Sequence, residues 1–114
     1  MHHSIDIASN AKMIEVLKAE FITEAADIFR VSLGGSAKQN MQDTLGAAVL
    51  VAYALAKRCG ISPADLSREV AEKADEGIKQ GHRLETNYKD LSLIKNHFES
   101  GKIIGFGQYK NKKA

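Results

Sequence analysis

Three carboxylates, Glu20, Glu24 and Asp27, follow one another at steps of four and three residues in a segment with helical periodicity. This spacing places them in one stripe about two turns long on a helix. The stripe has two interpretations: an ordinary solvated face, or one side of a Mg²⁺ site, because Mg²⁺ prefers oxygen ligands in an octahedron. A metal site needs a carboxylate from a second helix as well. Asp43, at the entrance to the next expected helix, is the candidate.

Other reactive side chains form no comparable pattern. His82, just past an expected helix end, is expected in a surface or capping role rather than in contact with a substrate. His97 has no second histidine or cysteine nearby, which argues against a zinc site. Cys59, the single cysteine, fits a buried helix end and is expected to be a structural thiol. The chain has no Gly-rich phosphate loop.

The elements that must position these residues are helices. One proline, Pro63, and the lack of alternation between polar and apolar residues predict an all-α bundle of four helices. Start and stop signals support this prediction: Ser62 and Asn87 can cap helix starts, and Gly60 and Gly101 can end helices. The expected helices cover residues 9–33, 36–59, 63–80 and 88–100. Leu91, Ile94 and Phe98 share one face of the last.

The second expected helix is apolar around most of its circumference. Its uncharged stretch, residues 45–56, carries bulky side chains on several sides: Leu45, Val49, Leu50, Val51 and Leu55. A helix of this kind must be buried nearly all round. In so small a chain, a second subunit is the expected cover, which favours a homodimer or a dimer of dimers. The expected organisation is one domain over residues 1–101 and a flexible basic tail over residues 102–114.

Size and composition exclude several classes of protein. With 114 residues, 44% apolar and 26% charged, the chain has the length and composition of one soluble domain. The apolar stretch of 12 residues is shorter than the roughly 20 needed to cross a bilayer. No secretion signal is recognisable at the start, so the cytoplasm is the expected compartment. Without the four lysines after residue 101, the chain carries 12 basic and 14 acidic side chains, which argues against nucleic-acid binding.

Several segments resemble, in order, the MazG-like branch of the all-α nucleotide pyrophosphohydrolases. Residues 23–28, Thr-Glu-Ala-Ala-Asp-Ile, stand where that family has Glu-Glu-x-x-Glu. Residues 43–47, Asp-Thr-Leu-Gly-Ala, stand at the second motif, often Glu-Glu-Leu-Gly-Asp. Residues 55–61 resemble the end of the family's apolar helix, and residues 69–73 its Glu-x-x-x-Lys. The resemblance covers residues 10–100.

The resemblance implies Mg²⁺-dependent hydrolysis of a nucleoside triphosphate to a monophosphate and pyrophosphate. Glu24, Asp27 and Asp43 would be the catalytic and metal-binding residues, with Mg²⁺ or Mn²⁺, and Lys73 would bind substrate. The chain departs from the family where Thr23 replaces the first glutamate, and where Thr44 and Ala47 replace the second glutamate and the aspartate of the second motif. Two functions therefore remain open: a weak nucleoside triphosphate pyrophosphohydrolase, or a catalytically inactive nucleotide-binding or protein-interaction module.

Overall fold

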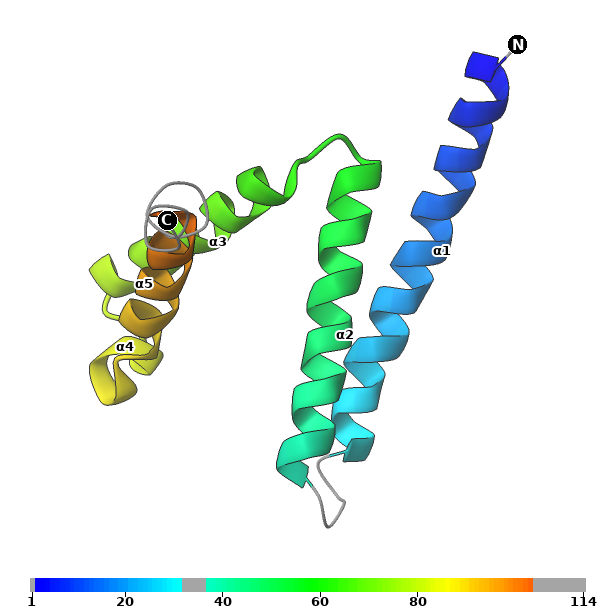
Figure 1. Cartoon of the computed structure of the whole chain (residues 1–114). Helices are drawn as coiled ribbons and strands as arrows, with labels where there is room; N and C mark the ends of the chain where they lie inside the picture. Colours follow the sequence, from blue (N-terminus) through cyan, green and yellow to red (C-terminus); the bar gives the residue numbers. More distant parts are fainter. Residues whose placement is uncertain (1, 32–36, 104–114) are drawn as a thin grey trace, which may run out of the picture. The chain divides into compact units, whose positions relative to one another are not determined.

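The computed structural model describes residues 2–31 and 37–103, which fold into helices joined by short turns (Figure 1). This part of the chain contains no β-strand. Its helices are α1 (His2–Val31), α2 (Ala37–Arg58), α3 (Pro63–Lys79), α4 (Arg83–Tyr88) and α5 (Asp90–Ile103). The predicted all-α class is confirmed. The predicted tail lies outside the described residues from residue 104 onward.

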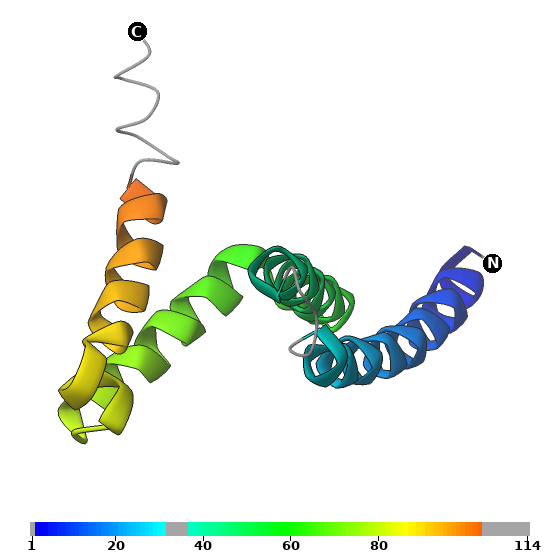
Figure 2. The same cartoon turned by 90° about the horizontal axis from the view of Figure 1, so that it is seen from below.

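The helices fall into two compact units, residues 1–63 and 64–114. In the first unit, α1 and α2 run antiparallel and lie side by side, as Figures 1 and 2 both show. Leu17 on α1 and Val51 on α2 are buried, each with 8% of its surface exposed. Alanines make up much of α2, for example Ala47 and Ala48, and their small side chains permit close approach of the two helices.

The turn after α2 has the geometry that the sequence predicts. Gly60 has a φ of +88°, a backbone conformation that favours glycine. Its N–H donates to the carbonyl of Lys57 at 3.0 Å, and the N–H of Ile61 donates to Ala56 at 2.8 Å. These two bonds form the Schellman motif that ends many helices. Cys59, predicted to be buried in this turn, is exposed instead, because it lies just past the last residue of α2.

The start of α3 agrees with the prediction, whereas the segment after it does not. Pro63 is the first residue of α3. The helix expected over residues 88–100 is present as α5, which begins at Asp90, but the short helix α4 before it was not predicted. Asn87 is not a cap and lies inside α4; the cap is His82, whose Nδ1 accepts the N–H of Leu84 at 3.0 Å. Lys89 then takes a left-handed conformation with a φ of 63°, which separates α4 from α5.

Three side-chain contacts hold the second unit together. The Asp75 carboxylate on α3 accepts bonds from Lys79 and from Lys95 on α5, both at 2.9 Å. Gly77 leaves room for Leu91, whose Cδ1 would lie 2.5 Å from an added Cβ. The contact between Glu85 and Ser92 links α4 to α5 and is described with the site below. On α5, Gly101 was expected to end the helix and lies within it.

Candidate functional site

The register of the α1–α2 hairpin, that is, which residues of α1 and α2 lie at the same height, determines where the candidate residues lie. The Nδ2 of Asn10 donates to the carbonyl of Arg58 at 2.9 Å, and the Arg58 guanidinium donates back to the Asn10 side chain at 3.2 Å. Since both helices rise about 1.5 Å per residue, residues equally far from this pair lie at the same height. Leu17 and Val51 are each seven residues away, and both are buried. This agreement supports the register.

Glu24 lies level with Thr44, because each is fourteen residues from the Asn10–Arg58 pair. The less exposed residues of α1 form one stripe towards α2: Asn10, Ile14, Leu17, Glu24, Asp27, Ile28 and Val31. Two carboxylates therefore stand in the stripe that otherwise makes the hairpin core. Glu20, the third member of the acidic pattern, is exposed. Glu24 and Asp27 are therefore partly buried against α2 and do not belong to a purely solvated face.

The carboxylate of Asp27 already has a partner on its own helix. The Arg30 guanidinium bonds to Asp27 Oδ1, one turn along α1. The Asp27 side chain remains 32% exposed, and that of Arg30 is 71% exposed. An ion pair this open to water is weak, so a cation with a higher charge can compete for the carboxylate.

On α2, the residues that replace the family's carboxylates are the ones turned towards α1. Thr44 is buried with 9% of its surface exposed, and Ala47 is half-buried. Asp43 is exposed, and its carboxylate accepts the Nε2–H of Gln39 at 3.3 Å. Successive residues of a helix differ by about 100° in direction, so Asp43 cannot occupy the position of Thr44. The α2 side of the candidate site is therefore uncharged where it is closest to Glu24.

The positions of the carboxylates determine what kind of divalent-cation site the described residues could form. Within residues 2–31 and 37–103, no three His, Cys, Asp or Glu side chains are grouped so that they could hold a metal ion. Mg²⁺ needs only one or two carboxylates when phosphates and water supply its other ligands. Glu24 and Asp27 meet that smaller requirement. A complete cluster built by the protein alone does not exist in the described residues.

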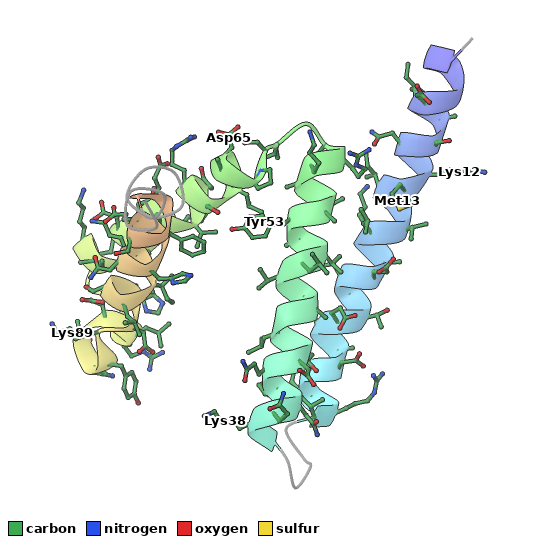
Figure 3. All side chains as sticks on the ribbon, in the orientation of Figure 1. Lys12, Met13, Lys38, Tyr53, Asp65 and Lys89 are labelled. Carbon is green, nitrogen blue, oxygen red and sulfur yellow. The ribbon has the colours of Figure 1, made fainter. Side chains whose placement is uncertain are left out.

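Lys73, the predicted substrate-binding residue, belongs to the other unit. It lies on α3, where its ammonium group is 3.4 Å from the Glu69 carboxylate, and both side chains are largely exposed. Its role towards the hairpin stays a prediction. Figure 3 labels two side chains that point away from the α1–α2 contact, Lys12 on α1 and Tyr53 on α2. Neither belongs to the candidate site.

A buried carboxylate that the sequence did not single out lies in the second unit. Glu85 has 8% of its surface exposed and accepts the Ser92 N–H at 2.8 Å and the Ser92 hydroxyl at 2.5 Å. The hydroxyl bond and then the amide bond lower the pKa of Glu85. This carboxylate caps the first turn of α5 and is structural. No sign of this role was visible in the sequence, because Glu85 lies in α4, a helix that was not predicted.

The model of the MazG-like family matches residues 7–91. No curated protein and no solved structure matches the chain. Among the described helices, none is by itself long and apolar enough to cross a membrane; residues 38–58 and 63–79 pass that test only when they are joined as a bent pair.

Proposed function

Because the chain belongs to the MazG-like family, we propose that its α1–α2 hairpin binds a nucleoside triphosphate and releases pyrophosphate from it slowly. The observation that carries this proposal is the position of Glu24 and Asp27. Both are half-buried in the stripe of α1 that faces α2, inside the segment matched by the family model. Carboxylates are uncommon in a helix contact unless they serve a purpose there.

In this proposal, Glu24 and Asp27 would hold a Mg²⁺ or Mn²⁺ ion beside the phosphates of the substrate. Such an ion would supply positive charge against the negative charge that develops when water attacks the phosphate next to the sugar. The bond between that phosphate and the next one breaks, and the products are a nucleoside monophosphate and pyrophosphate. Asp27 must release Arg30 for this purpose.

A second candidate, a nucleotide-binding or protein-interaction module without turnover, is favoured by one observation. The α2 positions nearest Glu24 are Thr44 and Ala47, which supply no charge. A site with two carboxylates holds one ion with the help of phosphates, whereas a multi-metal site needs more anions. We therefore expect slow turnover at most. The second candidate is the case in which the turnover rate is zero.

The binding step is tested by thermal unfolding with Mg²⁺ and a non-hydrolysable triphosphate. A ligand at ten times its dissociation constant stabilises the fold by about 1.4 kcal/mol, which raises the melting temperature by about 6–11 °C. Glu24→Gln should abolish this rise. Glu20→Gln removes the same charge from the exposed position one turn earlier and should preserve it. Equal behaviour of the two variants would contradict the proposed site.

The chemical step is tested by pyrophosphate release from common nucleoside triphosphates. The double change Thr44→Glu and Ala47→Asp restores carboxylates on the α2 side and should raise the rate above that of the natural protein. Residual activity should vanish in Glu24→Gln. Nucleotide binding without pyrophosphate release would favour the module. Robust turnover that survives Glu24→Gln would overturn both the site and the mechanism.

A further inference from the structure

The guanidinium of Arg30 is bound to a carboxylate of the candidate site. It donates to Asp27 Oδ1 from one turn further along α1. This pair differs from an ordinary surface pair of the same spacing, such as Lys18–Glu15, in which both side chains are more than half exposed. The Asp27 side chain is only 32% exposed and stands in the stripe that faces α2. Arg30 therefore reaches the candidate site itself.

Arg30 lies on the same side of the hairpin as the other acidic side chains. At about 100° per residue, Asp27 is turned from Glu24 by about 60°, and Arg30 by about 120° in the same sense. On α2, Asp43 is turned from Thr44 by about 100° in that sense as well. Because α1 and α2 run antiparallel, side by side in Figures 1 and 2, equal senses of rotation lead to one side of the pair. This side is called the acidic side below.

Two lysines at the same distance along the hairpin lie on the other side. Lys18 is six residues before Glu24, which turns it by about 120° in the opposite sense. Lys38 is six residues before Thr44, which makes it level with Arg30 but also turns it in the opposite sense. Figure 3 shows Lys38 pointing away from α1. Within two turns of Glu24, in the described part of the hairpin, Arg30 is thus the one cation on the acidic side.

The charge of the acidic side gives Arg30 a second possible partner. Four carboxylates lie on or next to this side: Glu20, Glu24, Asp27 and Asp43. They repel a triphosphate chain, which is itself strongly anionic, unless positive charge lies between them. A guanidinium suits this purpose, because its N–H groups form a fork that matches two phosphate oxygens. A phosphate beside Asp27 would find this fork already in place.

The ion pair is also easy to break. The Arg30 side chain is 71% exposed, and pairs this open to water contribute little to stability. Rotation of a long, solvated side chain can move the guanidinium by several ångströms without any change in the helices. Arg30 can therefore change partners at little cost.

We propose that Arg30 exchanges Asp27 for the phosphate chain when a nucleoside triphosphate binds. The inference rests on the proposed function and adds a coupling to it. Without a phosphate, Arg30 competes with a divalent cation for Asp27. With a phosphate, Arg30 binds the triphosphate and leaves Asp27 free for the cation. Arg30 thus makes the binding of the cation and the binding of the triphosphate favour each other.

The test compares two affinities. Binding of Mn²⁺ alone is followed by electron paramagnetic resonance, and the α,β-imido analogues of ATP, GTP, CTP and UTP are titrated calorimetrically in saturating Mn²⁺. Arg30→Gln should bind Mn²⁺ alone roughly 5-fold more tightly, because the competing positive charge is gone. It should bind the analogue preferred by the natural protein at least about 10-fold more weakly, because a charge-assisted bond to phosphate is lost.

Lys38→Gln is the matched control. It removes one positive charge at the same height on the other side of the hairpin, and it should change either affinity by less than about twofold. Circular dichroism verifies that both variants stay helical. Their melting temperatures without ligand should lie within a few degrees of the natural value, because both side chains are largely exposed.

The outcomes separate this exchange from the proposed function. If no analogue binds, or if Glu24→Gln binds it as well as the natural protein does, the proposed function fails and the exchange fails with it. If the analogue binds and Glu24→Gln abolishes binding, the proposed function stands. In that case the exchange requires both shifts in Arg30→Gln. It is overturned if either shift is missing, if both affinities move in the same direction, or if Lys38→Gln has the same effect.

Discussion

A single carboxylate introduced at position 44 should destabilise the hairpin until a divalent cation is added. Thr44 is 9% exposed and lies level with Glu24. Thr44→Glu therefore places two negative charges across a helix contact. At roughly 8 Å, a usual distance between packed helices, and an effective dielectric constant of about 20, their repulsion is about 2 kcal/mol. The melting temperature should fall by about 8–16 °C.

The assay is thermal unfolding at pH 7.5, with and without millimolar Mg²⁺. A cation between the two carboxylates replaces the repulsion by attraction, so Mg²⁺ should restore most of the lost stability. Acid should do the same. Like charges raise the pKa of a carboxyl group in the folded state, so the destabilisation is present at neutral pH and disappears when the pH falls below the raised pKa.

Two control variants separate charge from shape. Thr44→Gln introduces a side chain of similar size without charge and should show no response to Mg²⁺. Gln42→Glu introduces the same charge at an exposed position on α2, turned away from α1. It should change the melting temperature by a few degrees at most. If Thr44→Glu and Gln42→Glu behave alike, Thr44 does not face Glu24 and the register of the hairpin is wrong.

Three further predictions concern the fold. Leu17→Ala should cost about 2–3 kcal/mol in a urea titration, and the half-exposed Val16→Ala less than about 1 kcal/mol; equal losses would contradict the helix contact. Asn10→Ala removes the bond to the Arg58 carbonyl and should lower the melting temperature by about 4–8 °C, with no such loss in Lys12→Ala. Because the pKa of Glu85 is lowered from 4.5, its charge stabilises the fold above pH 4.5, and this contribution is lost as the pH falls through the lower folded value. Circular dichroism between pH 6 and 3 should show this loss, and a Glu85→Gln variant with the same acid sensitivity would refute it.

Helix positions could be predicted wherever the sequence holds a local signal. The end of α2 and the start of α3 follow from Gly60 and Pro63, whose backbone preferences act without help from distant residues. The break between α4 and α5 had no such signal, because Lys89 is not a residue type that favours a positive φ. There the side chains of His82 and Glu85 accept N–H groups in the first turns of α4 and α5 and stabilise the starts of these helices.

The candidate site, too, could be predicted from the sequence only in part. Sequence spacing placed Glu24 and Asp27 on one helix face, because helical periodicity is a local property. Sequence spacing could not show whether that face contacts water or another helix. It also could not show which residues of α2 lie level with which residues of α1. The Asn10–Arg58 contact joins residues that are far apart in the chain and fixes that height.

The sequence by itself determined the all-α class, the family and the identity of the carboxylates, since residue types, their order and their periodicity are enough for these. Only the tertiary structure decided that Thr44 faces Glu24 while Asp43 points away. This result depends on how α1 is rotated and shifted against α2. That rotation and shift come from contacts between distant residues, which no local pattern contains.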